Sequence, residues 1–352
     1  MAVPVPDSEE FDAPPSVLIV DDSVVARAVM ARAIDGAGRF IVAGAVQDAY
    51  AAQAFLAKHR VDVIVLDIEM PGIDGLTALP DLLAASRGAR VLIVSSACAD
   101  GAATTVQALA LGAADTLVKP DVGAFAGRFA DLLNEKIERL VEPDAVVAPR
   151  TPAASIAPGD DFDIVAIGAS TGGIHALSLL LRSLPVEFRL PVLITQHLPD
   201  SFMPYFAAQV AVLAGRPCEV AEDHARIRPG RILIAPGRAH MRCVSMGDGA
   251  AVRLSTMPAP SGCVPSVDPM LESVAETYGA RALGVVLSGM GRDGAIGAAA
   301  LASTGGSVVV QDRASSVIWG MPGAVVAGGI ADAILPPDEI GQLIARRRRP
   351  VC

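Results

Sequence analysis

Cysteine is scarce in this chain, and the five cysteines it has form no motif. They are scattered over the 352 residues, their number is odd, and no two have the Cys-x-x-Cys spacing. The sequence therefore lacks the paired patterns of structural zinc sites and of disulfide frameworks, and a reducing compartment fits it. The five are Cys98, Cys218, Cys243, Cys263 and Cys352.

Positive charge is also in short supply. The net charge is −10, and the one basic run, Arg346 to Arg349, lies at the C-terminus, where we interpret it as a solvated tail. Such an acidic chain favours neither nucleic acid nor an anionic membrane as a partner. Met1 to Pro15 has no basic or apolar region of a signal peptide. No apolar segment reaches membrane-spanning length uninterrupted, so we expect a cytoplasmic protein without membrane insertion.

Length and hydrophobic content predict two domains. The chain is long for one domain, and 52% of its residues are hydrophobic, which is enough for large cores. The patterns place one α/β domain at 16–140 and a second at 162–346. We expect residues 1–15 to be disordered, residues 141–161 to form a linker rich in proline and alanine, and residues 347–352 to form a basic tail.

The first domain alternates short apolar runs with amphipathic segments. Five strands with helices between them predict a parallel sheet that is covered on both faces. The expected strands are Val17–Val20, Phe40–Ala45, Val61–Leu66, Arg90–Val94 and Ala114–Val118. The expected helices begin near Val24, Ala49, Gly75 and Ala102, and a fifth runs from Val122 to Leu140.

Polar side chains follow four of these strands. Asp21 and Asp22 follow the first strand, Asp67 the third, Ser95 the fourth and Lys119 the fifth. Ligands of such sheets bind beyond the carboxyl ends of the strands. Three carboxylates there suit Mg²⁺, which prefers oxygen ligands, and a carboxylate can itself accept a phosphoryl group. The alternative is that these acids are solvated or cap the next helix.

Three stretches of this domain resemble the receiver domain of bacterial response regulators. They are Asp21-Asp22-Ser23, the segment from Leu66 to Gly75, and Lys119-Pro120, and the resemblance covers about Ser16 to Leu140. It implies a flavodoxin-like fold, a cis peptide before Pro120 and a histidine kinase as the phosphodonor.

The resemblance also assigns a role to each polar residue at the strand ends. It makes Asp67 the phosphoacceptor, and it places Asp21, Asp22 and Asp67 in a Mg²⁺ site. It makes Ser95 the switch hydroxyl and Lys119 the lysine that contacts the phosphate.

The second domain opens with a strand, a tight turn and a helix. The apolar run Ile164–Ala169 leads into Ser170 and glycines, and an amphipathic segment runs from Ile174 to Leu184. Gly168-x-Ser170-x-Gly172 is the pattern of a nucleophile elbow, which exposes a hydroxyl beside a helix N-terminus. Two alternatives remain. Ser170 could cap the helix, or the turn could be a dinucleotide fingerprint, although the middle glycine of that motif is missing.

Two later strand ends carry residues that would complete a hydrolytic site. His197 follows the apolar run Pro191–Thr195, and Asp293 follows the run Arg281–Ser288 in a glycine-rich loop. If these strands are parallel neighbours of the first, Ser170, His197 and Asp293 face one crevice. Ser170 would then attack, His197 would take its proton, and Asp293 would fix the imidazole. The alternatives are a surface histidine and a turn or capping aspartate.

The chain order of this set is Ser, His, Asp, whereas ordinary α/β-hydrolases run Ser, Asp, His. The second domain is therefore not an α/β-hydrolase, and we expect a doubly wound, mostly parallel α/β fold for it. Backbone N–H groups near Thr171 and Met290 are candidates for binding the oxyanion. His240 is the main rival for the base, and the remaining histidines, His59, His175 and His224, compete weakly.

The second domain resembles the catalytic domain of the chemotaxis protein-glutamate methylesterase family (CheB), which is also a protein-glutamine glutaminase. The resemblance implies the triad Ser170, His197 and Asp293, with Thr171 and Met290 as further active-site contributors. The matching stretches, from about Asp163 to Leu335, are Gly168–Gly173, Thr195–Pro199, Ala235–Gly237, Pro265–Asp268, Gly289–Gly294, and Gln311-Asp312 through Trp319–Pro322. Arg292 and His175 depart from the family's usual residues, which would affect substrate docking rather than the chemistry.

These observations predict a serine esterase of sensory adaptation that phosphorylation activates. Its substrates would be glutamyl methyl esters on chemoreceptors, its products glutamate and methanol, and deamidation of receptor glutamines would be a second reaction. Hydrolysis needs no cofactor, and the unphosphorylated receiver would limit access to the Ser170 crevice. Two alternatives are the same hydrolase in a chemosensory pathway other than motility and a non-catalytic adaptor. A DNA-binding output would need a basic helix-turn-helix region, which the second domain lacks.

Overall fold

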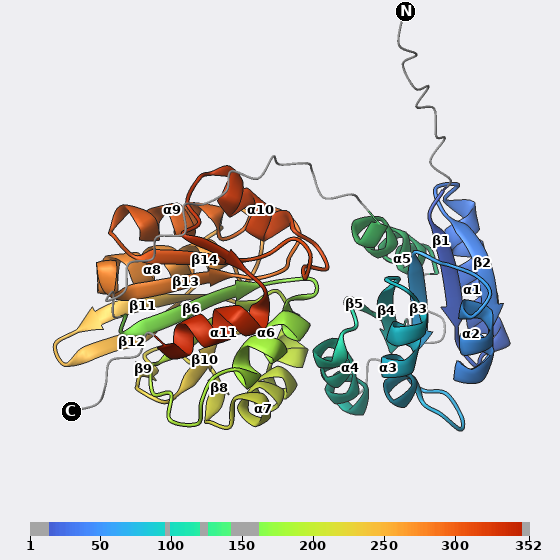
Figure 1. The fold of residues 1–352 in the computed structure, drawn as a ribbon, viewed down its shortest axis with the longest axis horizontal. Coiled ribbons are helices and arrows are strands. Elements are labelled where there is room, and N and C mark those ends of the chain that lie inside the picture. The colour runs from blue at the N-terminus through green and yellow to red at the C-terminus, as the bar shows by residue number, and fades with distance from the viewer. Residues whose placement is uncertain (1–13, 96–98, 120–125, 142–161, 347–352) are drawn as a thin grey trace, which may run out of the picture.

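The computed structural model describes residues 14–95, 99–119, 126–141 and 162–346. These residues form two α/β domains that lie side by side (Figure 1). Predictions for residues 1–13, for the peptide before Pro120, for residues 142–161 and for the C-terminal tail lie outside the described residues.

The N-terminal domain has a five-stranded parallel sheet in the order β2-β1-β3-β4-β5, which confirms the predicted fold. Neighbouring residues of β1 alternate between its faces: Leu18 packs with α2, α3 and α4, whereas Ile19 packs with α1 and α5. The elements are β1 (Ser16–Val20), α1 (Val24–Gly36), β2 (Ile41–Val46), α2 (Ala49–Leu56), β3 (Val63–Asp67), α3 (Gly75–Ala85), β4 (Arg90–Ser95), α4 (Ala99–Leu111), β5 (Asp115–Val118) and α5 (Ala126–Val141).

Two helix boundaries in this domain differ from the sequence prediction. The helix expected near Ala102 already includes Ala99, and α5 extends to Val141, one residue into the predicted linker. The first helix begins at Val24 as expected, and the Ser23 hydroxyl caps it by accepting from the Ala26 N–H at 3.2 Å. Because Ser23 is the cap, Asp21 and Asp22 are not needed for that purpose.

The C-terminal domain is built on a seven-stranded parallel sheet in the order β15-β14-β13-β6-β7-β10-β8. Helices α6, α7 and α11 cover one face, and α8, α9 and α10 cover the other, so the sheet is doubly wound as predicted. The elements that build it are β6 (Ile164–Ala169), α6 (Gly173–Arg182), β7 (Val192–Gln196), α7 (Met203–Ala214), β8 (Cys218–Val220), β10 (Ile232–Ile234), α8 (Val267–Tyr278), β13 (Ala282–Val286), α9 (Ala295–Ser303), β14 (Ser307–Gln311), α10 (Gly320–Ala327), β15 (Ala333–Leu335) and α11 (Pro337–Arg346).

Sequence analysis did not predict a small antiparallel sheet, which combines a strand between β8 and β10 with a hairpin between β10 and α8. It has the order β11-β12-β9, with β9 (Arg226–Ile227), β11 (His240–Met246) and β12 (Gly249–Ser255). Two short 3₁₀ helices, η1 (Asp200–Phe202) and η2 (Gly279–Arg281), complete the domain.

The strand order creates a crevice at the carboxyl end of β6. The chain runs from β6 to β7 and outward, and then returns to place β13 on the other side of β6. Such a switch point in a doubly wound sheet is where ligands bind. The residues that follow β6, β7 and β13 therefore meet at one edge of the sheet.

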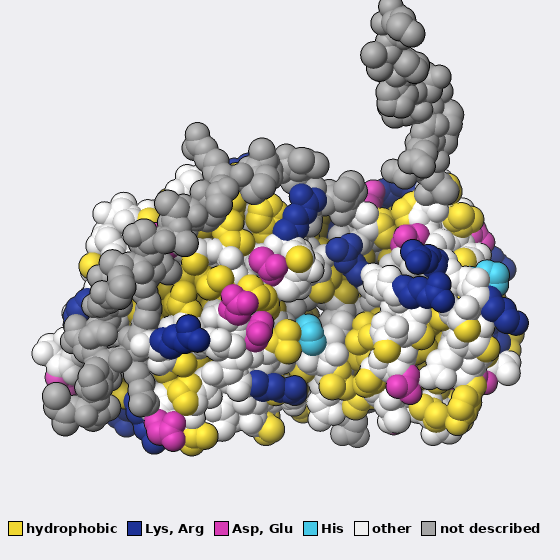
Figure 2. Space-filling view, viewed as in Figure 1, with side chains coloured by type: hydrophobic (Ala, Val, Ile, Leu, Met, Phe, Trp, Pro, Cys, Tyr) yellow, Lys and Arg dark blue, Asp and Glu magenta, His cyan; other side chains and the backbone are white. Residues whose placement is uncertain are grey.

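The two domains pack against each other through their helices. Helix α4 lies against α6 and α7, and one hydrophobic cluster runs through both domains at this contact. In the lower half of the space-filling view the two surfaces meet (Figure 2). None of the described helices is both long and apolar enough to cross a bilayer.

Candidate active site

The turn between β6 and α6 presents Ser170 at the crevice. Gly172, with a φ of +75°, is the N-cap of α6, so Ser170 does not cap the helix and that alternative is wrong. A Cβ on Gly289 would lie only 2.7 Å from the Cβ of Ser170, so glycine is required there for the neighbouring loop to approach. The Ser170 side chain is left to interact across the crevice.

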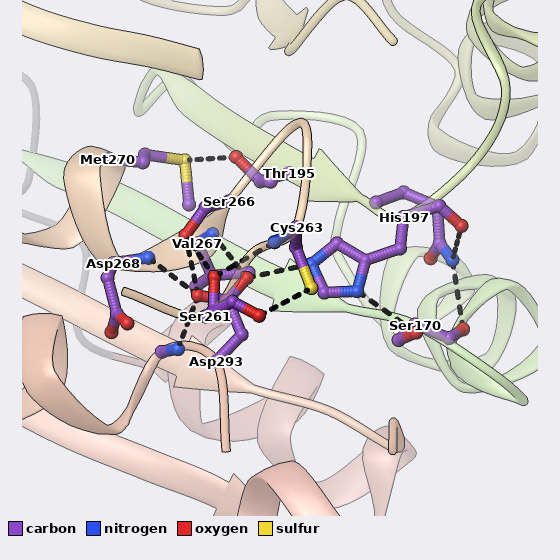
Figure 3. Close-up of polar contacts among 12 residues, drawn as sticks. Ser170, Thr195, His197, Ser261, Cys263, Ser266, Val267, Asp268, Met270 and Asp293 are labelled. Atoms are coloured by element: carbon purple, nitrogen blue, oxygen red, sulfur yellow. Dashed lines mark hydrogen bonds and ion pairs between the residues drawn. The ribbon is translucent and has the colours of Figure 1, made fainter. Parts of the chain in front are cut away.

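Ser170, His197 and Asp293 form a continuous chain of hydrogen bonds (Figure 3). The Nδ1 of His197 lies 3.1 Å from the Ser170 hydroxyl, and its Nε2 lies 2.7 Å from Oδ2 of Asp293. Because the carboxylate accepts the Nε2 proton, Nδ1 of the neutral imidazole carries the lone pair that faces Ser170. The ring is thus used in the opposite sense from the familiar arrangement, in which Nε2 faces the serine.

Asp293 is surrounded by donors at the N-terminus of α8. Its Oδ1 accepts from the Ser266 hydroxyl at 2.6 Å, and its Oδ2 accepts from the Val267 N–H at 2.8 Å. The Asp268 and Gly294 N–H groups add longer hydrogen bonds. Burial alone would raise the pKa of Asp293, but the hydrogen bonds from His197, Ser266 and Val267 outweigh it and lower the pKa well below its ordinary value. Asp293 is therefore a permanent carboxylate.

His197 is a stronger base in this arrangement than a free histidine. Burial alone would lower the pKa of His197, but its hydrogen bonds to Asp293 and Cys263 outweigh burial and raise the pKa to about 9. A histidine with this pKa is mostly protonated at neutral pH. Asp293 and Cys263 therefore favour an imidazolium, which cannot take a proton from Ser170 until it is deprotonated.

Two neighbours of the triad were not singled out by sequence analysis. Ser266 lies in the stretch Pro265–Asp268, which carried the family resemblance but no assigned role, and it holds Asp293. Cys263 contacts His197 from the same loop, and no motif marked it. A lone cysteine in a loop carries no sequence signal, since its position is decided by the fold.

The rival histidine, His240, has a different place. It is buried behind the crevice, where its Nδ1 accepts the Ser266 N–H at 2.9 Å. It therefore supports the loop that holds Asp293 and has no contact with Ser170. Its position does not suit a base for this serine.

Thr171 and Met290, the predicted contributors to oxyanion binding, both have backbone N–H groups without a protein partner among the described residues. Thr171 lines the space beside Ser170, Met290 lines the hollow beside Asp293, and neither N–H donates a hydrogen bond to any of the described residues. By contrast, the Ser170 N–H is already bonded to the Ser288 carbonyl at 3.0 Å. The role of Thr171 and Met290 in binding the oxyanion stays a prediction.

The polar residues at the strand ends of the N-terminal domain also converge. Lys119 Nζ lies 2.7 Å from Asp67 and 3.0 Å from Asp21. Burial raises the pKa of Asp67, although Lys119 partly offsets this effect. Ser95 ends β4, and its hydroxyl lies 2.9 Å from the hydroxyl of Thr105 on α4.

The carboxylates of Asp21, Asp22 and Asp67 form an all-oxygen donor set. One oxygen of each lies within 4.8 Å of the others. Asp22 is exposed, whereas Asp21 and Asp67 are buried, so the group opens toward solvent at Asp22. Such a hard, open set fits the preferences of Mg²⁺.

The N-terminal domain covers the Ser170 crevice. The Ala114 carbonyl accepts the Gly172 N–H at 2.9 Å, and the Ala110 carbonyl lies 3.1 Å from Nδ1 of His175. The space left between Ser170, His197 and the Ala114 segment is only about 30 Å³. That volume is about the share of one water molecule in the liquid. A side chain carrying an ester cannot enter from this direction.

The residues that depart from the family's usual pattern lie in different places. His175 was expected to affect substrate docking, and it faces the N-terminal domain at the contact just described. Arg292 is exposed and lines a hollow of about 810 Å³ beside Asp293, bordered by α9 and α10. Of the two, Arg292 is the one placed to meet a molecule from solution.

Comparison with known proteins gives matches for both domains. Residues 165–344 match the family described as CheB methylesterase, and residues 17–124 match the response regulator receiver domain. Protein-glutamate methylesterase/protein-glutamine glutaminase 2 of Caulobacter vibrioides is 42% identical over 347 residues, which cover 95% of this chain and 99% of the relative. Protein-glutamate methylesterase/protein-glutamine glutaminase 1 of Paramagnetospirillum magneticum is 38% identical over 367 residues, which cover 94% and 96%.

A solved structure is similar to the C-terminal domain. The CheB methylesterase catalytic domain of Thermotoga maritima is 33% identical, covers 52% of this chain and 97% of its own, and has a TM-score of 0.51. Because the methylesterase match spans half of the chain and the relatives align over almost all of it, the chain belongs to the CheB methylesterase family and carries a response regulator receiver domain.

Proposed function

We propose that this protein is a serine esterase that hydrolyses glutamyl methyl esters on chemoreceptors. The observation that carries the proposal is the hydrogen-bonded chain of Ser170, His197 and Asp293 at the switch point of the sheet. The names of its relatives, which specify protein-glutamate methylesterase and protein-glutamine glutaminase, support the choice of substrate. The substrate would be met in the cytoplasm, where the receptors would present their methylated helices.

Hydrolysis follows from the proton relay. Nδ1 of His197 takes the proton of Ser170 as the serine oxygen attacks the ester carbonyl carbon, and Asp293 stabilises the resulting imidazolium. The N–H groups of Thr171 and Met290 bind the oxyanion. The intermediate collapses to an acyl-serine, and His197 returns the proton to the departing methanol. Water then attacks the acyl-serine by the same relay and releases glutamate.

The same relay would deamidate receptor glutamines. The leaving group is then ammonia, which also departs with a proton from His197. Amides are less reactive than esters, so we expect the esterase reaction to be faster at equal substrate concentration. No cofactor takes part in either reaction.

The receiver would control access to Ser170. A histidine kinase would transfer a phosphoryl group to Asp67, with Lys119 neutralising the added charge. Mg²⁺, held by Asp21, Asp22 and Asp67, would neutralise the oxygens of the phosphoryl group. The contact between Ala114 and Gly172 supports a closed resting state, because it leaves no room for substrate beside Ser170.

A short path connects Asp67 to that contact. The hydroxyls of Ser95 and Thr105 lie 2.9 Å apart, and Thr105 belongs to α4, which packs against α6 and α7. If the Ser95 hydroxyl turns toward a phosphoryl group on Asp67, it leaves Thr105 without this partner. Helix α4 would then be freed to move, and the population would shift from the closed arrangement.

The deciding experiment measures methanol release from methylated receptor membranes, with and without a small-molecule phosphodonor. We expect the donor to raise the rate for the native chain, and Ser170→Ala to abolish release, by a factor on the order of 10⁴ to 10⁶. Ser178→Ala is the matched control, because Ser178 is a buried serine on α6 whose hydroxyl bonds to the Ile174 carbonyl.

Two outcomes would overturn parts of the proposal. If the native chain releases no methanol although Asp67 is phosphorylated, the chain is not an esterase for that receptor, and a non-catalytic adaptor becomes the better reading. If Asp67→Ala retains stimulation by the phosphodonor, the control by phosphorylation is wrong. Testing receptors of pathways other than motility would distinguish the remaining alternative, the same hydrolase acting elsewhere.

A further inference from the structure

A third metal-ligating side chain lies against the catalytic pair. Figure 3 shows the thiol of Cys263 beside the imidazole of His197, at the end that faces Asp293. One ligand atom each of His197, Cys263 and Asp293 lies within 4.8 Å of the other two. The described residues contain one other such group, the all-carboxylate set of the receiver. The triad of this chain therefore has a donor set of nitrogen, sulfur and oxygen that hydrolysis does not require.

We propose that His197, Cys263 and Asp293 bind a thiophilic divalent cation of the Zn²⁺ class, and that the bound ion inhibits hydrolysis at Ser170. Zinc in proteins is commonly held by this combination of imidazole, thiolate and carboxylate. Mg²⁺ is a hard cation that prefers oxygen ligands to a thiolate, so we expect it to bind at the carboxylates of the receiver. The chain would thus sort two kinds of divalent cation between its domains.

The geometry needs only small movements to accept zinc. With zinc bond lengths of 2.0–2.3 Å and tetrahedral angles, ligand atoms around one ion lie about 3.3–3.6 Å apart. The Nε2 of His197 and Oδ2 of Asp293 are 2.7 Å apart, so this pair must open by roughly 0.6 Å. The sulfur of Cys263, which lies within 4.8 Å of a ligand atom of His197 and of Asp293, must move closer to both. Both shifts are within reach of side-chain rotation.

The carboxylate ligand is already oriented. The Val267 N–H donates to Oδ2 of Asp293 at 2.8 Å, and the Ser266 hydroxyl donates to Oδ1 at 2.6 Å. Hydrogen bonds of this kind fix metal-binding carboxylates in place. A cation would replace the proton between His197 and Asp293 and the proton of the Cys263 thiol, which would both be released to water, and every other bond to the carboxylate would remain.

The ion has an entry path and room for a fourth ligand. Cys263 and Asp293 both line the 810 Å³ hollow next to α9 and α10. This hollow lies on a different side of the triad from the contact between Ala114 and Gly172. Water from the hollow could complete a tetrahedral site. The receiver therefore does not have to move for the ion to bind.

Inhibition follows from the orientation of the imidazole. A cation on Nε2 leaves the neutral ring with its proton on Nδ1, the nitrogen that faces Ser170 at 3.1 Å. An Nδ1–H group donates a hydrogen bond and cannot accept the serine proton. This inhibitory step rests on the proposed esterase function, whereas binding of the ion does not.

The first experiment measures binding by absorption spectroscopy of the metal-free full chain titrated with Co²⁺. Cobalt bound by a thiolate gains a thiolate-to-metal charge-transfer absorption, which cobalt bound by carboxylates lacks, so the receiver site stays silent. We expect this absorption in the native chain and its loss in Cys263→Ser. Cys218→Ser is the matched control and retains it, because Cys218 belongs to no metal-ligating group among the described residues.

Displacement of cobalt by Zn²⁺ then gives the zinc affinity. We expect Cys263→Ser to weaken zinc binding by at least about tenfold, since even changes in the residues around a metal's ligands cost 10- to 100-fold. His197→Gln should weaken binding similarly, and it serves if Cys263→Ser does not fold. A native chain without the charge-transfer absorption, or one whose absorption survives in Cys263→Ser, would refute the site.

The second experiment measures methanol release over a range of Zn²⁺, with each variant compared with its own zinc-free rate. We expect zinc to inhibit the native chain reversibly, with a chelator restoring the rate, and Cys263→Ser to need at least about tenfold more zinc. If zinc binds but the rate is unchanged, the inhibitory step is wrong. If no variant releases methanol under any condition, the proposed function fails, while the cobalt experiment still decides the site.

Discussion

Each domain buries an aspartate at the carboxyl end of a parallel strand: Asp67 is the last residue of β3, and Asp293 lies in the loop after β13. Both residues are 2% exposed, yet their pKa values move in opposite directions. Burial raises the pKa of Asp67, whose ionic partner Lys119 is shared with Asp21. Asp293 overcomes equal burial because a serine hydroxyl, backbone N–H groups at a helix N-terminus and His197 all donate to it. The number of donors, and not burial, separates the two.

The difference matches the work proposed for each residue. Asp67 would use its own oxygen as a nucleophile, and extra donors would occupy the lone pairs it needs. Asp293 would never react, and it only has to remain charged beside His197. A carboxylate that reacts is left sparsely bonded, whereas one that orients a neighbour is saturated with hydrogen bonds.

The largest expected effect comes from removing the charge of Asp293 while keeping its shape. In Asp293→Asn the amide cannot stabilise an imidazolium, and we expect kcat for methanol release to fall by a factor on the order of 10⁴. Steady-state kinetics at saturating substrate measures this loss. The same change at Asp67 should cost stimulation by the phosphodonor, and not hydrolysis itself. If both variants lost unstimulated activity to a similar extent, the two aspartates would not have the different roles proposed for them.

The next effect is the dependence of hydrolysis on pH. His197 acts as a base only when neutral, and with its pKa at about 9 it is mostly protonated at pH 7. Activity should therefore rise with pH, by about 50-fold between pH 7 and pH 9 if the base limits the rate. The rate is measured with a chelator present to exclude metal. A profile that is level above pH 7 would mean that the donors around Asp293 do not act on His197 in this way.

A smaller effect is expected from removing one donor to Asp293. In Ser266→Ala the 2.6 Å hydrogen bond to Oδ1 is lost. A hydrogen bond to a charged group is worth about 1.5–3 kcal/mol, so we expect the free energy of unfolding to fall by about that amount and kcat to fall by about tenfold. Denaturant unfolding and initial rates give the two values. Ser178→Ala should lower stability alone, and an equal loss of kcat in that control would show that the effect is not specific to Asp293.

The smallest expected effect concerns the contact between the domains. His175→Ala removes the hydrogen bond to the Ala110 carbonyl. A neutral hydrogen bond contributes about 1 kcal/mol, so we expect the rate without phosphodonor to rise by about two- to fivefold. The rate with phosphodonor should stay the same, because that state is already open. His224→Ala, a change at an exposed histidine of the C-terminal domain, is the control. An unchanged or lower rate in His175→Ala would argue against a closed resting state.

Sequence patterns predicted the first sheet and three of the seven strands of the second, because buried parallel strands are continuous apolar runs. The patterns also predicted that Ser170, His197 and Asp293 lie at one edge of the sheet, since residues that follow parallel strands meet there. The order of the strands could not be read in this way. The neighbour relation of β6 and β13 joins segments more than a hundred residues apart, and only the packed sheet decides it.

The remaining parts of the site lacked a readable local signal. Cys263 and Ser266 lie in a loop without periodicity, so their contacts with His197 and Asp293 depend on how that loop packs. The hairpin of β11 and β12 did have a local signal, which the sequence analysis did not use. Gly247 and Asp248 form a two-residue connection between runs that pair in register. The contact of Ala114 with Gly172 depends on two surfaces meeting, and neither segment encodes it alone.

The bond between Ala114 and Gly172 joins two backbone groups. Almost any residue at position 114 supplies the same carbonyl, and Gly112, with a φ of +121°, sets the turn that aims it. Substitution of the side chain at position 114 during evolution would leave this hydrogen bond intact. An insertion or deletion of one residue between 112 and 114 would displace the carbonyl completely. The number of residues in this segment, more than their identity, is thus what evolution must preserve to keep the two domains coupled.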